Sequence, residues 1–99
     1  MKNSRRIRRS ILSQPYLADL LLFLKDHGEI MANELIEVHS NYPKMMALVL
    51  RLQILGLIDI REERSPHLIK RISLSKKGKE LVTLIERFDE AASKSKLVR

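Results

Sequence analysis

Apolar residues recur at helical spacing in the segment from Tyr16 to His27. Four leucines fall at positions i, i+3, i+4 and i+7, which is the spacing of one buried stripe along an α-helix. They are Leu17, Leu20, Leu21 and Leu24. Ser13 is a candidate N-cap residue, Pro15 suits the first turn, and Gly28 is a natural stop after the last turn. The segment therefore predicts a first helix with a leucine face turned to the core.

A second, shorter helix is expected from Met31 or Ala32 to Val38, followed by a turn up to Pro43. Its inward-facing residues would be Met31, Leu35 and Ile36. The segment before Pro43 favours a turn because Ser and Asn side chains compete for backbone hydrogen bonds, and because Pro is favoured at the first position of a helix. The pattern is therefore helix, short turn, helix.

The third helix is expected from Pro43 to Leu55, and Gly56 would end it. At about 100° per residue, one arc of this helix collects apolar residues that must face the core. They are Met45, Leu48, Val49, Leu52 and Leu55. The opposite arc carries Met46, Ala47, Leu50, Arg51, Gln53 and Ile54. The outward side of the third helix is therefore largely apolar.

After Gly56 the period of the apolar residues changes from about 3.6 to about 2, which is typical of strands. One face would carry Ile58, Ile60, Leu68, Lys70, Ile72 and Leu74. The intervening segment from Arg64 to His67 has the composition of a turn. This part of the chain therefore predicts a two-stranded hairpin.

A last helix is expected from about Lys76 to Ser93, with Ser75 as its cap. Its apolar residues form a single stripe of Leu81, Leu84, Ile85, Phe88, Ala91 and Ala92. A helix of this length extends about 27 Å, which is long for the core of a small domain. We therefore expect part of the stripe to need a partner, and we place a homodimer contact at Leu84, Ile85, Phe88 and Ala92.

The length and composition bound the class of protein. With 99 residues the chain can form one modest core, and without cysteine it has no disulfide, thiolate metal site or cysteine nucleophile. Nothing favours an oxidising compartment, so we expect a cytoplasmic protein. No apolar run approaches the roughly 20 residues of a membrane span, and we expect no signal peptide.

The net charge of +7 points to a polyanionic partner, with nucleic acid ahead of an anionic membrane surface. The charge is unevenly distributed. Residues 1–13 carry five Lys or Arg and no acidic residue, residues 14–60 carry three against six, and residues 61–99 carry eleven against six. Attraction to a polyanion is therefore expected at the two ends of the chain, around a mildly acidic middle.

Two short motifs resemble those of a known family. The run Leu52–Ile58 (LQILGLI) resembles the L-x-x-x-G-L-I with which the recognition helix of MarR- and PadR-like regulators enters the wing. The run Leu74–Leu81 (LSKKGKEL) is similar to the L-T-x-x-G-x-x-L of the same families, with Ser in place of Thr. With the helices before them, the resemblance covers about residues 15–90. It implies an α+β, mainly helical fold, the winged helix-turn-helix, with three helices, a two-stranded wing and a long C-terminal helix.

The two glycines of these motifs also have expected structural roles. Gly56 permits the left-handed backbone that ends the third helix, and Gly78 would let the last helix pack closely against a neighbour. On this basis we divide the chain into a basic N-terminal arm (1–13), a winged helix-turn-helix domain (14–75) and a C-terminal helix with a short tail (76–99), which would form the dimer.

The resemblance implies a transcriptional regulator, and more specifically a repressor, that binds operator DNA as a homodimer. Carried over by position, it places the groove-facing residues of the third helix at Asn41, Lys44, Ala47 and Arg51. In the wing it selects Arg64, His67, Lys70 and Arg71. No cofactor is implied, and whether a small molecule regulates the protein is left open.

The outward face of the third helix has two interpretations. Base edges in the major groove are mostly donors and acceptors, so Met46 and Ala47 would serve only for thymine methyl groups. Leu50 and Ile54 would then lie under the N-terminal segment or a second subunit. Alternatively, this face binds a protein.

The basic N-terminal segment contains Arg5, Arg6, Arg8 and Arg9 and has three interpretations. It is a solvated tail, or a flexible arm that follows the DNA, or a helix that packs on the partner subunit through Ile7, Ile11 and Leu12. The last two are compatible with each other.

The remaining residues give little support to catalysis or metal binding. His27, His39 and His67 are expected at a helix end, a turn and the wing, without the pairing that a metal site needs. No nucleophile motif or phosphate-binding glycine loop is present, so we expect no enzyme activity. The rivals to sequence-specific DNA binding are a protein-interaction module and a sequence-tolerant architectural DNA-binding protein.

Overall fold

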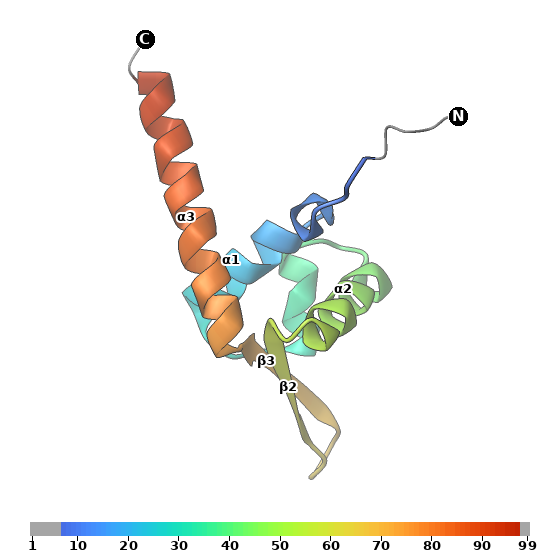
Figure 1. The fold of residues 1–99 in the computed structure, drawn as a ribbon. Helices are drawn as coiled ribbons and strands as arrows, with labels where there is room; N and C mark the ends of the chain where they lie inside the picture. The colour runs from blue at the N-terminus through green and yellow to red at the C-terminus, as the bar shows by residue number, and fades with distance from the viewer. Residues whose placement is uncertain (1–6, 98–99) are drawn as a thin grey trace, which may run out of the picture.

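The computed structural model describes residues 7–97 and shows an α+β, mainly helical fold. Its elements are η1 (Ile11–Ser13), α1 (Leu17–His27), β1 (Ile30–Met31), η2 (Ala32–Glu37), α2 (Tyr42–Ile54), β2 (Ile58–Glu63), β3 (Ile69–Leu74) and α3 (Lys76–Leu97). The helices α1 and α2 and the short η2 pack around one core, and the β2–β3 hairpin projects from it as a wing (Figure 1). This is the winged helix-turn-helix arrangement, and the expected fold class is confirmed.

The predicted core faces of the two main helices are largely confirmed. The four leucines of the first stripe are buried in α1, and Met45, Leu48, Val49 and Leu52 are buried in α2. Leu55 is an exception, because α2 ends at Ile54 and Leu55 follows as the half-exposed C-cap residue.

The start of the first helix differs from the prediction. Ser13 does not cap α1 but belongs to the 3₁₀ turn η1, where its Oγ donates a hydrogen bond to the carbonyl of Ser10 (2.7 Å). The chain then turns at Tyr16, which has left-handed backbone angles (φ 64°) and directly precedes α1. The helix therefore begins at Leu17, without a side-chain cap.

The second helical element is confirmed in place but is a 3₁₀ helix, η2. With about three residues per turn, it aligns every third side chain on one face. Ala32, Leu35 and Val38 accordingly pack on the core, whereas Met31 and Ile36 are exposed. The prediction that Met31 and Ile36 face inward was wrong because it assumed the period of an α-helix.

The hairpin is confirmed, and it is part of a three-stranded antiparallel sheet with the order β1-β3-β2. Ile58 lies opposite Leu74 and Ile60 opposite Ile72, which places the apolar face of the wing on the core as expected. Leu68 lies outside the strand and is exposed, contrary to the prediction. The two-residue strand β1 was not predicted.

The two motifs that resemble MarR- and PadR-like proteins meet in space. Gly56 has left-handed backbone angles (φ 79°), and its carbonyl accepts a 2.6 Å hydrogen bond from Ser75 Oγ. The same Oγ accepts from the backbone N–H of Gly78 (3.0 Å), so Ser75 caps α3 as predicted. Gly78 lies directly on the backbone of Leu57, and a Cβ at this position would come 2.0 Å from the Leu57 carbonyl oxygen. The motif pair therefore joins the end of α2, the start of the wing and the start of α3.

The last helix, α3, is longer than predicted and extends away from the domain (Figure 1). Its first half packs on the core through Gly78, Val82 and Ile85, and Glu86 accepts hydrogen bonds from Lys25 Nζ at 2.6 and 2.7 Å. From Arg87 to Lys94 every side chain is exposed. The distal half of α3 therefore has no core of its own in the monomer.

Candidate nucleic-acid interface

The start of α2 is held by a chain of hydrogen bonds. Asn41 is the N-cap residue, and its side-chain oxygen accepts from the backbone N–H of Lys44 at 3.0 Å. The backbone N–H of Asn41 donates in turn to Nδ1 of His39 at 3.0 Å. Cap bonds of this kind fix the first turn of a helix. The exposed side chain of Lys44 therefore projects from a well-ordered end of α2.

The turn before α1 packs against this same end of α2. The Tyr16 ring lies 4.5 Å from the His39 ring between centroids, and the Lys44 ammonium lies 5.3 Å from the centre of the Tyr16 ring. That distance is within the range of a cation–π interaction. Tyr16, in its left-handed conformation, thus connects the N-terminal segment to the beginning of α2.

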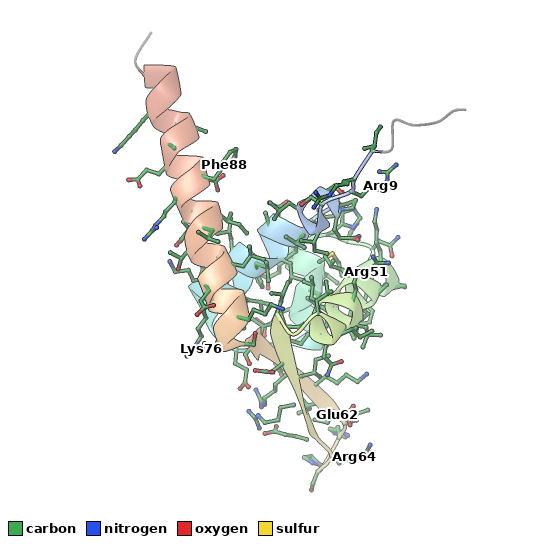
Figure 2. All side chains as sticks on the ribbon, viewed as in Figure 1. Arg9, Arg51, Glu62, Arg64, Lys76 and Phe88 are labelled. Atoms are coloured by element: carbon green, nitrogen blue, oxygen red, sulfur yellow. The ribbon has the colours of Figure 1, made fainter. Side chains whose placement is uncertain are left out.

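Two adjoining hollows lie between the N-terminal segment and α2. The first, the Lys44 hollow, has a volume of about 190 Å³, and Tyr16, Lys44, Ala47 and Arg51 line it together with Gln14, Pro15, Met45 and Leu48. The second, the Arg9 hollow, has about 350 Å³ and is lined by Arg9, Ser10, Ile11, Ser13, Gln14 and Arg51. Figure 2 shows Arg9 and Arg51 on the same side of the molecule. Arg51 borders both hollows and joins them into one basic surface.

The cations of this surface lack ion-pair partners. Within residues 7–97, no carboxylate forms an ion pair with Arg9, Lys44 or Arg51. All three side chains are exposed. Their charge is therefore not neutralised within the described part of the chain.

The wing differs from this surface in its ion pairing, because its arginines are paired with its own glutamates. Arg71 Nε lies 3.0 Å from Glu63, whose other oxygen is 2.7 Å from Arg61, and Arg64 lies 3.3 Å from Glu62. Figure 2 shows Glu62 and Arg64 at the far end of the wing. The expectation of a freely basic wing therefore applies to His67 and Lys70 more than to Arg64 and Arg71.

The ion pairs of the wing shift the pKa values of Glu63 and Arg61. Hydrogen bonds from Arg71 and then from Arg61 hold the pKa of the Glu63 carboxyl below its ordinary value. The same contact with Glu63, and then one with Glu29 at 2.8 Å, raises the pKa of Arg61. Glu63 thus lies between two arginines, Arg61 and Arg71, which both favour its charged form.

The outermost ridge of α2 is apolar, as the sequence indicated. Ile54 is 84% exposed and Leu50 is 47% exposed, whereas Met46 packs partly on the core. The described part of the N-terminal segment borders the neighbouring, Arg51-bearing flank of α2 and leaves Leu50 and Ile54 uncovered. These two side chains are therefore available to DNA or to a protein.

The structure places the predicted groove residues together on one exposed flank of α2: Asn41, Lys44, Ala47 and Arg51. The predicted wing residues lie apart from them on the hairpin, and Arg5 and Arg6 lie outside the described residues.

The sequence analysis did not identify four residues that border this flank or hold its turn, which are Ser10, Gln14, Tyr16 and His39. Ser10 accepts from the backbone N–H of Leu12 (3.0 Å), and the Ser-x-x-Ser spacing of Ser10 and Ser13 was the one available signal of a turn.

The predicted dimer residues do not share one surface. Ile85 is buried in the monomer core, whereas Leu84 is 59% exposed and Phe88 is 73% exposed. Ala92 is exposed on the distal half of α3. Beside Leu84, an apolar groove of about 370 Å³ runs between α3, the end of α2 and η1, and Ile11, Leu55 and Leu81 contribute to its lining. The apolar stripe of α3 is thus shared between the core and an open surface.

Comparison with protein-family models, curated proteins and solved structures finds no match to this chain. In the part of the chain that the structure describes, no helix is long and apolar enough to span a membrane. Among the same residues, no group of three or more His, Asp or Glu side chains is arranged as a metal site.

Proposed function

We propose that this protein binds double-stranded DNA with sequence preference, as a homodimer, and regulates transcription. The observation that carries the proposal is the contrast in charge compensation between α2 and the wing. Lys44 and Arg51 lie on an exposed helix flank without carboxylate partners, whereas Arg64 and Arg71 are engaged by wing glutamates. Unpaired cations on an exposed helix beside a wing are what a groove-binding element requires.

The roles follow from the positions. Arg51 and Lys44 are the side chains that reach base edges or phosphates, and the methyl group of Ala47 suits a thymine methyl. Lys70 and His67 of the wing contact the DNA backbone beside the groove. The resemblance of the motif pair to MarR- and PadR-like regulators agrees with this assignment and favours a repressor.

The homodimer forms through the exposed apolar side chains of α3, from Leu84 towards its C-terminal end. An isolated amphipathic helix is only marginally stable in water, so the exposed Leu84 and Phe88 favour burial against a second copy. A two-fold dimer would present two α2 helices to successive major grooves, which is how paired half-sites are read.

The roles of Lys44 and Arg51 are tested by fluorescence anisotropy with a duplex selected for binding and with an unrelated duplex. Lys44→Ala and Arg51→Ala should each weaken the selected duplex by about tenfold or more, because a base contact contributes roughly 1–3 kcal/mol. Lys76→Ala removes the same charge from the start of α3 and serves as the matched control. Equal losses of Lys44→Ala on both duplexes, or losses of both variants no larger than that of Lys76→Ala, would contradict base reading by α2.

One observation favours a second function. The exposed ridge of Leu50 and Ile54 is unusual for a helix that reads bases and suits a protein-binding surface. If the protein is a protein-interaction module, Lys44→Ala and Arg51→Ala should leave binding of the partner protein intact. Leu50→Asp combined with Ile54→Asp should abolish that binding.

A further inference from the structure

The N-terminal segment is folded onto α2 in the described part of the chain. Ser10 caps the 3₁₀ turn η1 by accepting from the N–H of Leu12 at 3.0 Å, and Ser13 Oγ closes the turn onto the Ser10 carbonyl at 2.7 Å. The Tyr16 ring then contacts His39. Residues 10–16 therefore form a fixed connection to α2, and Arg9 is positioned by it.

This arrangement brings two arginines to one hollow. Arg9 from the N-terminal segment and Arg51 from α2 both line the Arg9 hollow, with Ser10, Ser13 and Gln14 as polar neighbours. Within residues 7–97 neither guanidinium has a carboxylate partner. Two like charges facing one hollow repel each other unless an anion lies between them. Guanidinium groups bind phosphate and carboxylate through paired hydrogen bonds, and phosphate is the anion that DNA supplies.

We propose that Arg9 and Arg51 together form a binding site for a single phosphate group, and that in the complex this group belongs to the DNA backbone beside the groove that α2 enters. The inference rests on the proposed DNA binding. It assigns a fixed phosphate contact to the N-terminal segment, in place of a mobile arm. A phosphate held from both elements would fix the register of α2 along the groove.

The salt dependence of binding tests whether the two arginines share one phosphate. The logarithm of the binding constant falls with the logarithm of salt concentration by about 0.9 for each neutralised phosphate. Arg9→Gln and Arg51→Gln should each lower affinity for the selected duplex, yet each should nearly keep the wild-type slope, because the other arginine still neutralises the phosphate. The double variant should lower the slope by about 0.9.

Arg8→Gln is the matched control, since Arg8 precedes Arg9 but does not line the hollow. The salt-dependence slope could instead fall by about 0.9 in each single variant and by about 1.8 in the double variant. That result would show that the arginines contact two separate phosphates and would overturn the shared site. If Arg9→Gln has the same affinity for the selected duplex as Arg8→Gln, while Arg51→Gln still binds it more weakly, Arg9 has no role at the site. The proposed DNA binding would remain intact.

A second measurement identifies the source of the phosphate. Side-chain NMR of the Arg9 and Arg51 Nε–H groups is followed during titration with inorganic phosphate and, separately, with the duplex. Shifts that saturate with the duplex and not with inorganic phosphate support the DNA backbone. If the protein binds no duplex but the two arginine signals saturate together with inorganic phosphate, the shared site exists and binds a free anion. That result would contradict the proposed DNA binding. Shifts with neither would overturn the proposal.

Discussion

At the scale of single residues, the junction of α2, the wing and α3 depends on two glycines and one serine. Gly56 turns the chain in a left-handed conformation, Ser75 bonds to it and caps α3, and Gly78 allows α3 to touch the backbone of Leu57. None of these residues faces the candidate interface. Their contribution is to set the direction in which α3 leaves the domain.

We predict that Gly78→Ala destabilises the domain by about 1–3 kcal/mol or more, as overpacking of a tight contact does. The new Cβ would lie 2.0 Å from the Leu57 carbonyl oxygen, so the helix or the turn must shift. Urea unfolding followed by circular dichroism measures the change. Lys76→Ala, an exposed site two residues earlier, should have little effect, and equal stability of the two variants would contradict this account of the junction.

At the scale of elements, the wing is ordered by ion pairs that its register creates. Arg61 and Arg71 lie opposite each other in the paired strands, and Glu63 bridges them. Arg61 is exposed and Glu63 and Arg71 are only partly buried, so each pair contributes little to overall stability. Their effect is to direct the wing arginines to glutamates, whereas Lys44 and Arg51 of α2 have no ion pair among the described residues.

We predict that Glu63 titrates below an ordinary glutamate and that Arg71→Ala moves its midpoint upward, because Arg71 is the main cause of the lowered pKa. A folded-state pKa below that of the unfolded chain means that the stabilisation is present at neutral pH and is lost as the pH falls through the folded value. Carboxyl NMR of Glu63 across the acid range measures both midpoints. An unchanged midpoint in the variant would show that Arg71 does not hold this carboxylate.

The sequence predicted the main elements because their signals are periodic. The leucine stripe of α1, the core face of α2 and the alternation in the wing each repeat several times, so the elements were identified correctly. The strand β1 has two residues, too few to show a period, and η2 has six residues, too few to distinguish a three-residue period from that of an α-helix. A left-handed Tyr16 also has no sequence signal, because glycine or asparagine is the usual residue there.

At the scale of the whole molecule, the net charge of +7 conceals two different surfaces. The sequence located the excess of cations at the chain ends but could not show which cations are paired. That depends on strand register in the wing and on the packing of the N-terminal segment against Arg51. The folded domain brings Arg9 from the first segment to the mildly acidic middle and so makes a basic surface that no single stretch of sequence contains.

We predict that the protein is a dimer at tens of micromolar and that Leu84→Glu with Phe88→Glu makes it a monomer, because both side chains are exposed on α3 and would place charge in an apolar contact. Light scattering measures the mass, and circular dichroism checks that the fold is kept. Ile54→Glu, an equally apolar and exposed site on α2, should leave the dimer intact. A monomeric wild-type protein would contradict the dimer.

The central claim, that α2 reads DNA sequence, is tested most directly by selecting bound duplexes from a random pool at two salt concentrations. The account predicts a recurring motif of two related half-sites about one helical turn apart, retained at the higher salt, and lost when Lys44 and Arg51 are both replaced by alanine. Binding without any enriched motif would instead indicate a sequence-tolerant architectural protein. No recovery of duplex at the lower salt concentration would contradict DNA binding altogether.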